Sequence, residues 1–383
     1  MLAGRSLTRF RKSLLTWFGQ FQRDLPWRRT NDPYRIWLSE IMLQQTRVAA
    51  AIRYFERFLE RFPDVRALAE APEEEVLRLW AGLGYYTRAR NLQKAAKQIV
   101  AGHNSRFPEK LEQALALPGI GRYTAAAVLS IAYGKRLAVL DGNVARVLAR
   151  LQAVRGDLRS NGRWLALQKN ADALLAKRAP GDWNQAMMEL GATLCTPRSP
   201  QCLLCPVNEF CEARKLGLTG VIPEKRNKRA TVEITLAALV LVNFKGEALL
   251  LPPPKSPAKA ATAEGVAALL SRMWHFPTVQ VQQDAKNDLR KFVSKAVYGG
   301  KRFPARLKAL AKVRHAVTYR QITLHPFRAD VAKLPHVPGG KVIPLADLSS
   351  VAISNLTRKV AERAVNGLPQ IFRRRSGQAA DPT

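Results

Sequence analysis

The four cysteines of this chain lie within one short segment, and this clustering limits what that segment can fold into. Cys195, Cys202, Cys205 and Cys211 are separated by six, two and five residues. Because no cysteine is left to pair elsewhere, the group indicates one site with four thiolate ligands, not a set of disulfides. Thiolates without histidine favour an iron–sulfur cluster or zinc. Structural zinc sites usually repeat a Cys-x2-Cys pair, and only the middle pair here has that spacing.

The spacing of six, two and five residues resembles the [4Fe–4S] loop of the endonuclease III and MutY families of DNA-repair glycosylases. The resemblance implies a [4Fe–4S] cluster as the cofactor. Arg198 lies in the longest of the three intervals, where it could offer positive charge to a DNA phosphate or remain a solvated charge. Reduced thiols that hold a cluster predict a cytoplasmic, nucleoid-associated protein.

The charge balance indicates a polyanionic partner. The 383 residues include 62 Lys and Arg against 29 Asp and Glu, a net charge of +33. Nucleic acid is the commonest polyanion that such an excess serves. No apolar run reaches the roughly 18 residues that a bilayer requires. We therefore expect a protein that binds double-stranded DNA as a monomer and does not associate with a membrane.

The texture of the sequence changes once along the chain. Residues 1–216 show apolar residues at helical spacing, as in 36–62, 89–101 and 124–133, and predict an all-α domain. A basic linker is expected at 217–230. β-like runs at 231–243, 248–251 and 321–331 then predict a smaller α+β domain over 231–365. We expect a mobile loop at 252–265 and a disordered tail at 366–383.

A glycine-rich turn separates two of the predicted helices. Leu117, Pro118, Gly119, Ile120 and Gly121 form this turn within residues 111–133. Glycines allow the backbone to approach a ligand closely and leave N–H groups at the start of the next helix, where a phosphate can bind. The segment resembles the helix–hairpin–helix of the same glycosylase superfamily, so Leu117, Gly119 and Gly121 are candidate DNA-binding residues.

Two carboxylates stand out in the helical domain. Glu40 lies among apolar residues of a predicted helix, and desolvation would raise the pKa of its carboxyl and prepare it to donate a proton. Asp141 follows an apolar run and is predicted to be a helix N-cap whose carboxylate stays ionised. A protonated acid and an ionised acid together are what cleavage of a glycosidic bond requires. An acid that faces solvent remains the alternative for Glu40.

The motifs at residues 37–46, 82–86, 140–144 and 184–191 resemble those of MutY-type adenine DNA glycosylases. The resemblance runs nearly continuously over residues 23–212. It implies that Glu40 protonates adenine and that Asp141 stabilises the sugar cation. By matching position, Asn143, Arg23 and Tyr123 complete the active site. Gln44 and Tyr85 would probe or wedge the DNA stack, and core packing is the alternative for both.

Tyr123 distinguishes two sister families. Relatives that also cleave the strand place a lysine in the helix after the hairpin, where its amine attacks the sugar. This chain has no lysine between Gly119 and Gly134. The sequence therefore predicts a monofunctional, adenine-specific hydrolase. The alternatives are a bifunctional pyrimidine glycosylase with lyase activity and, from another class, a non-catalytic DNA-binding iron–sulfur protein.

The second domain resembles, more weakly, the Nudix-like domain with which this family reads 8-oxoguanine opposite the target adenine. The usual Phe-Ser-His triplet aligns on Val317, Thr318 and Tyr319. Thr318 keeps a hydroxyl and Tyr319 offers a ring, but the preceding aromatic residue is missing. Pyrophosphohydrolase activity is not expected because the Nudix metal box is absent from the sequence. The expected substrate is duplex DNA with an A:8-oxoG or A:G mispair.

Overall fold

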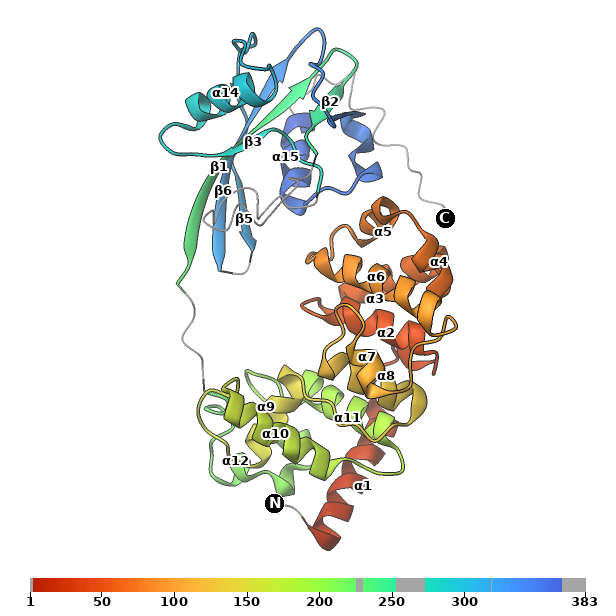
Figure 1. Cartoon of the computed structure of the whole chain (residues 1–383). Helices are drawn as coiled ribbons and strands as arrows, with labels where there is room; N and C mark the ends of the chain where they lie inside the picture. The colour runs from red at the N-terminus through yellow and green to blue at the C-terminus, as the bar shows by residue number, and fades with distance from the viewer. Residues whose placement is uncertain (1–2, 225–229, 253–272, 318, 367–383) are drawn as a thin grey trace, which may run out of the picture. The chain divides into compact units, whose positions relative to one another are not determined.

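The computed structural model describes residues 3–224, 230–252, 273–317 and 319–366 (Figure 1). The chain divides into two compact units, one of residues 1–71 and 87–227 and one of residues 72–86 and 228–383. The division near residue 227 falls inside the segment predicted as a linker. Residues 72–86, which we predicted as part of the helical domain, group with the second unit. Most of the predicted loop at 252–265, and all but the first residue of the predicted tail, lie outside the described residues.

The first unit consists of helices joined by short turns. Its helices are α1 (Gly4–Phe21), η1 (Pro26–Arg28), α2 (Pro33–Leu43), α3 (Val48–Arg61), α4 (Val65–Glu70), α6 (Thr87–Gly102), α7 (Leu111–Leu115), α8 (Arg122–Tyr133), α9 (Gly142–Leu151), α10 (Asn161–Leu174), α11 (Pro180–Thr193), η2 (Cys202–Leu204), η3 (Asn208–Phe210) and α12 (Glu212–Lys215). No helix in the described part of the chain is long and apolar enough to cross a bilayer.

The continuous helical stretch that we predicted at 36–62 is interrupted. α2 ends at Leu43 and α3 begins at Val48. Between them, Gln45 has a φ of 60°, a left-handed conformation that a helix does not contain. Apolar spacing resumes at Val48, and the break contains no glycine or proline that would mark it in the sequence.

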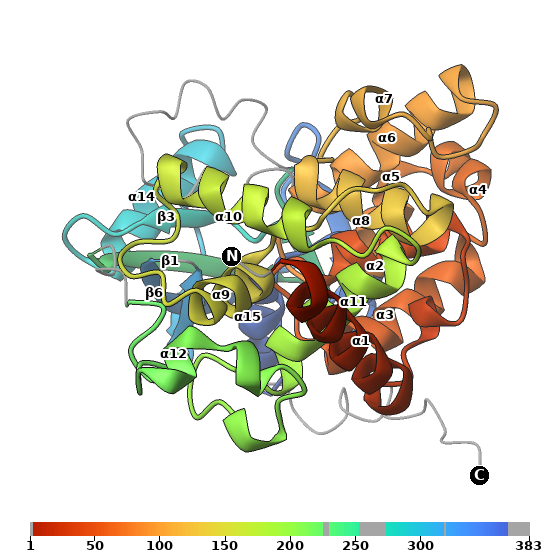
Figure 2. The ribbon, with the colours of Figure 1, turned by 90° about the horizontal axis from the view of Figure 1, so that it is seen from below.

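Helix α8 is the centre of the first unit. Every residue from Thr124 to Ser130 is buried, so α8 must be covered on all sides. It packs against α2 on one side and α11 on another, and α1 runs beside α11 (Figure 2). Three successive alanines, Ala125 to Ala127, let these neighbours approach closely. This packing brings α2, the start of α8 and α11 around one point.

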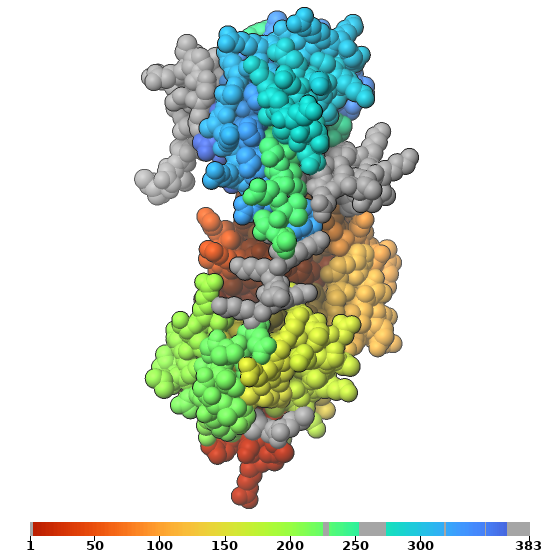
Figure 3. Space-filling view, turned by 90° about the vertical axis from the view of Figure 1, so that its left-hand side faces the viewer, coloured from red at the N-terminus to blue at the C-terminus, as the bar shows by residue number. Residues whose placement is uncertain are grey.

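The cysteine segment packs on α9. α12 lies against α9, and Val207, Ala213 and Ile222 join the core that α9 shares with α1 and α11. Figure 3 shows the green surface of this segment beside the yellow surface of the chain near residue 150. The segment is therefore a lobe of the first unit, anchored by apolar residues between and after its cysteines.

The second unit is built on one sheet. It contains α5 (Glu73–Trp80), β1 (Val232–Val242), β2 (Glu247–Leu250), β3 (Thr278–Gln280), α14 (Ala285–Ala296), β4 (Lys308–Ala309), β5 (Val313–Val317), β6 (Arg320–Asp330), β7 (Lys341–Pro344), η5 (Leu345–Ser350) and α15 (Asn355–Asn366). Among the described residues, seven strands form the sheet, along the path β4-β6-β1-β2-β7, with β3 on β1 and β5 on β6. β1 and β6 pair in parallel over their whole length.

Both faces of this sheet are covered, and alternation along β1 shows how. Leu236 and Val240 share a core with α15, whereas Leu239 and Leu241 share a core with α14. The two helices accordingly lie on opposite faces of the sheet in Figure 1. Strands buried on both faces are apolar throughout, which is the pattern that predicted β1. The predicted fold class, an all-α helix–hairpin–helix domain followed by a smaller α+β domain, is confirmed.

Candidate active site

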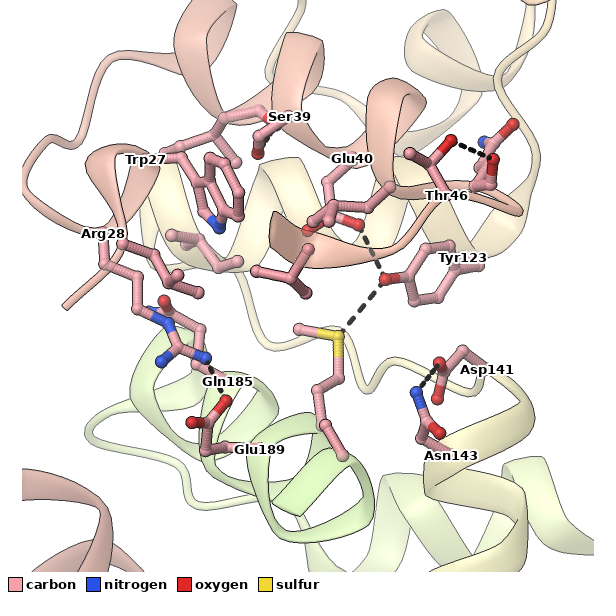
Figure 4. A pocket seen from close by; sticks show the side chains of 18 of the residues that line it. Trp27, Arg28, Ser39, Glu40, Thr46, Tyr123, Asp141, Asn143, Gln185 and Glu189 are labelled. Carbon is pink, nitrogen blue, oxygen red and sulfur yellow. Dashed lines mark hydrogen bonds and ion pairs between the residues drawn. The ribbon is translucent and has the colours of Figure 1, made fainter. Parts of the chain in front are cut away.

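Six helices of the first unit converge on a cavity of about 700 Å³. Its walls come from η1, α2, the start of α3, α8, the start of α9 and α11, and Figure 4 shows side chains of the lining pointing into it. All five residues predicted for the active site line this cavity: Arg23, Glu40, Tyr123, Asp141 and Asn143. Gln44, which was predicted to contact the DNA stack, also lines it. They come from segments spread over more than a hundred residues of sequence, and only the helix packing brings them together.

Glu40 is buried in the middle of α2, with 6% of its surface exposed. The hydroxyl of Tyr123 donates a 2.6 Å hydrogen bond to its Oε2 atom (Figure 4). Burial raises the pKa of Glu40 to about 7; the Tyr123 hydrogen bond lowers it, and the charge of Asp141 raises it. Burial also raises the pKa of Tyr123 well above its ordinary value, so that hydroxyl keeps its proton. The predicted desolvation of Glu40 is confirmed.

Asp141 is the N-cap of α9, as predicted. Its Oδ1 accepts a 2.7 Å hydrogen bond from the Val144 N–H, and its Oδ2 accepts one of 3.1 Å from Asn143 Nδ2. Burial raises the pKa of Asp141 and outweighs these donors, which lower it. The N-cap fixes the direction of the carboxylate, and Asn143 occupies one of its oxygens. The free part of the carboxylate faces the same cavity as Glu40.

Arg146 and Gly191 hold Asn143 from behind. Arg146 Nη2 donates to Asn143 Oδ1 at 2.9 Å and to the Gly191 carbonyl at 2.7 Å, and its Nε donates to the Cys195 carbonyl at 2.8 Å. A Cβ added at Gly191 would lie 2.8 Å from Asn143 Cβ, closer than real Cβ contacts. The start of α9 therefore packs directly on the backbone of α11.

Glu189, for which the sequence predicted no role, forms an ion-pair cluster at the cavity wall. Arg23 donates to both of its oxygens at 2.7 Å, and Arg28 donates to Oε2 at 2.8 Å. The Glu189 side chain is 1% exposed. Burial raises its pKa, but the two guanidinium groups outweigh burial and lower the pKa to about 2. The sequence did contain a pattern that could have found Glu189, because this acid lies in an apolar helix, as Glu40 does.

Further lining residues also went unassigned. Trp27, Gln185 and Met188 contribute an indole, an amide and a thioether to the cavity. The Met188 sulfur lies 3.2 Å from the Tyr123 hydroxyl. The cavity thus combines flat apolar walls with a few polar groups of fixed direction, the composition expected of a small-molecule or base pocket.

The glycine turn between α7 and α8 has the predicted conformation. Gly119 has a φ of 79°, and a Cβ there would lie 2.7 Å from Asn91 Cβ, so only glycine fits. Gly121 is the N-cap of α8. The Leu117 side chain is buried, so only its backbone is available to a partner. The turn can therefore offer N–H groups to a phosphate, while Leu117 supports it from below.

The remaining predicted DNA contacts are not among the described residues that line the cavity. Arg198 is exposed on the cysteine segment. Tyr85 belongs to the second unit, has a φ of 49° and is 49% exposed. Tyr319 also belongs to the second unit, where the Arg320 guanidinium lies 5.0 Å from its ring centroid. Thr318 lies outside the described residues. Their predicted contacts with DNA stay predictions.

The four cysteines line a second, smaller cavity of the first unit, together with Arg150 and Arg214. None of the four forms a disulfide, and burial raises the pKa of the Cys205 thiol to about 12. Such thiols ionise only when a metal centre and positive charge compensate. Arg150 is 2% exposed, and its Nη2 atom has no hydrogen-bond partner within the described part of the chain. This donor set, thiols with an unpartnered buried cation, fits an anionic iron–sulfur cluster.

Comparison with known proteins identifies the family. The model of the HhH-GPD superfamily of base excision DNA repair proteins matches residues 38–164, and that of the iron-sulfur binding domain of endonuclease III matches residues 195–211. Human adenine DNA glycosylase is 35% identical over 405 residues, which cover 92% of this chain and 73% of the human protein. The chain belongs to the adenine DNA glycosylase family. The mouse protein is 33% identical over 92% of this chain and 77% of its own length.

A solved structure agrees with the family assignment for the first unit. A thermostable thymine-DNA glycosylase has a TM-score of 0.51 and 30% identity, and the match covers 55% of this chain and 97% of that one. The adenine DNA glycosylase family consists of hydrolases of base excision repair, so the predicted enzyme class, the action on DNA and the [4Fe–4S] cofactor are confirmed. Cys195, Cys202, Cys205 and Cys211 all lie within the matched domain and are the residues that would hold the cluster.

Proposed function

We propose that this adenine DNA glycosylase family member excises adenine mispaired with 8-oxoguanine or guanine, with Glu40 as the acid, Asp141 as the stabilising carboxylate and no strand cleavage. The observation that carries the proposal is the state of Glu40. Its carboxyl is buried, has a pKa of about 7 and shares one cavity with the Asp141 carboxylate. A carboxylic acid with a pKa near the working pH is suited to general acid catalysis.

The proposed reaction uses both carboxyl groups. The enzyme flips the adenine nucleotide out of the duplex so that the base enters the cavity. Glu40 gives its proton to the base as the bond from C1′ to the base nitrogen breaks, and the bonding electrons leave with the base. Asp141 faces the positive charge that develops on the sugar. Water then adds to C1′, and Glu40 takes up the proton that this water loses.

The cavity offers no group for lyase chemistry. None of the described residues that line it is a lysine, and Tyr123 occupies the helix position expected of the nucleophile. Since burial raises the pKa of Tyr123, its hydroxyl is neutral and a weak nucleophile. The cluster supplies a rigid, charge-bearing lobe when bound, and no proton or nucleophile. These facts favour simple hydrolysis over the bifunctional alternative.

Recognition of the opposite base would fall to the second unit. The turn between β5 and β6 carries Tyr319 with the Arg320 guanidinium over its ring. An aromatic plane and a cation suit contact with a flipped or exposed purine. Because Val317 replaces the family's aromatic residue, we expect a smaller preference for 8-oxoguanine over guanine than the Phe-Ser-His triplet would give.

The test is single-turnover excision on duplexes with A:8-oxoG, A:G, A:C and T:G pairs. Wild-type enzyme should release adenine fastest opposite 8-oxoguanine and leave thymine in place. Glu40→Gln should lower the rate by at least about 10²-fold, the usual contribution of an aligned acid. Glu60→Gln, at an exposed position of α3, is the matched control and should keep the wild-type rate. Unchanged excision by Glu40→Gln would refute the mechanism, and abundant borohydride-trapped adduct would refute simple hydrolysis.

A further inference from the structure

The side chain of Arg150 lies at the junction of the cysteine cavity and the core. Its Nη1 donates to Cys195 Sγ at 3.2 Å and to the Thr196 carbonyl at 2.8 Å. Its Nε donates to the Ile222 carbonyl at 2.7 Å. These three bonds fix the plane of the guanidinium, so that a buried cation is held directly against one of the cluster ligands.

The third nitrogen of this guanidinium differs from the other two. Nη2 is buried and has no hydrogen-bond partner in the described residues, although it belongs to a cation that is 2% exposed. A buried donor left without a partner is costly, and a buried cation needs a compensating negative charge. No carboxylate lines this cavity among the described residues, and its other ionisable groups are the four thiols and Arg214. The compensating charge must therefore come from the thiolates and the group they hold.

We propose that Arg150 is a positioning residue for the [4Fe–4S] cluster. The Arg150 guanidinium raises the reduction potential of the cluster and protects the cluster from oxidative loss. Hydrogen bonds to the ligand sulfurs and nearby charge are among the factors that set cluster potentials. Adding an electron makes the cluster more negative, so a fixed cation stabilises the reduced form more than the oxidised form. Since solvent screens Arg150 little, its effect exceeds that of an exposed arginine at the same cavity.

The experiment measures the one-electron reduction potential of the cluster in the purified, cluster-loaded protein. At a fixed potential, Arg150→Gln should shift the ratio of oxidised to reduced cluster at least tenfold toward the oxidised form. For a one-electron couple, this shift corresponds to a fall of about 59 mV in the reduction potential of the cluster. Arg214→Gln removes the same charge from an exposed residue of the same cavity and should shift the ratio less than threefold. Cluster absorbance should also decay several-fold faster in oxidant for Arg150→Gln than for Arg214→Gln.

Arg150→Lys covers the case in which Arg150→Gln loses its cluster during purification. It keeps the charge, but one ammonium cannot reach the sulfur and both carbonyls together. We expect the ratio to shift about threefold toward the oxidised form. Equal shifts for Arg150→Gln and Arg214→Gln would overturn the proposal, as would an unchanged or higher potential in Arg150→Lys. Neither readout uses base excision, so the result is independent of the proposed reaction.

Discussion

Removal of the Tyr123 hydroxyl tests the acid role of Glu40 directly. If Glu40 must be protonated to act, the excision rate falls as pH rises through its pKa of about 7. The Tyr123 hydroxyl donates to the ionised carboxylate and so lowers this pKa. Tyr123→Phe removes that donor while burial remains. The pKa of Glu40 therefore rises, and the alkaline limb of the pH–rate profile moves to higher pH.

The size of this shift follows from the strength of the bond. A hydrogen bond to a charged group contributes about 1.5–3 kcal/mol. Since one pKa unit corresponds to about 1.4 kcal/mol, full loss would raise the pKa by about 1–2 units. Water can enter the space that the hydroxyl leaves and replace part of the bond, so we expect about 1 unit. Above both midpoints, the protonated fraction of Glu40 would then be about tenfold larger than in wild type.

The assay is single-turnover release of adenine between about pH 5 and 9, with saturating enzyme. The midpoint of the alkaline limb is the readout, because Tyr123→Phe could also change the plateau rate. Tyr133→Phe is the matched control: Tyr133 is at the end of the same helix, and its hydroxyl donates to the Phe107 carbonyl outside the cavity. It should leave the midpoint in place. A midpoint that stays at its wild-type value or falls in Tyr123→Phe would show that another group sets the limb.

Two further predictions concern residues that support the site. Glu189→Gln leaves two arginines without their buried partner and should lower the free energy of unfolding by about 3 kcal/mol at pH 7. Because the folded pKa of Glu189 is depressed to about 2, this difference in stability from wild type should shrink as pH falls from about 4.5 toward 2. Urea unfolding at both ends of that pH range is the measurement. Gly191→Ala should push Asn143 from its place, destabilise the fold by about 1–3 kcal/mol and slow excision. Gly142→Ala is the control, because nothing lies within 4 Å of a Cβ added there, and it should change neither stability nor excision. Equal excision rates in the two variants would refute this packing role.

The candidate acids and cluster ligands of the site were easier to predict from the sequence than the residues that hold them in place. Glu40 and Asp141 could be found because each interrupts an apolar pattern, and the cluster ligands because of their spacing. The break at Gln45 could not be found, since it depends on backbone conformation and not on polarity. Arg150 was missed for a different reason. Its helix contains two arginines, Arg146 and Arg150, one turn apart, and only the fold shows that Arg150 is buried against a cysteine.

The strands of the second unit also show which features depend on tertiary structure and cannot be predicted from the sequence. β1 and β6 are long, with eleven residues each, and both were predicted within a residue or two of their observed ends. β5 and β7 are short strands with alternating exposure, and the sequence did not predict them. Short strands of this kind are stable because a neighbour supplies hydrogen bonds, not because of their own composition. Their existence is decided by tertiary pairing, here with β6 and β2.

Two glutamates in one cavity show how surroundings divide the roles. Both are almost fully buried, and burial alone raises the pKa of each. Glu40 accepts a hydrogen bond from one neutral hydroxyl, and its pKa is about 7. Glu189 accepts hydrogen bonds from two guanidinium groups, which lower its pKa to about 2. At neutral pH only Glu40 can carry a proton to a leaving base. Glu189 is held as an anion at neutral pH and fixes Arg23 and Arg28 at the wall. In the proposed mechanism, a residue type that appears twice is therefore once the acid and once a scaffold.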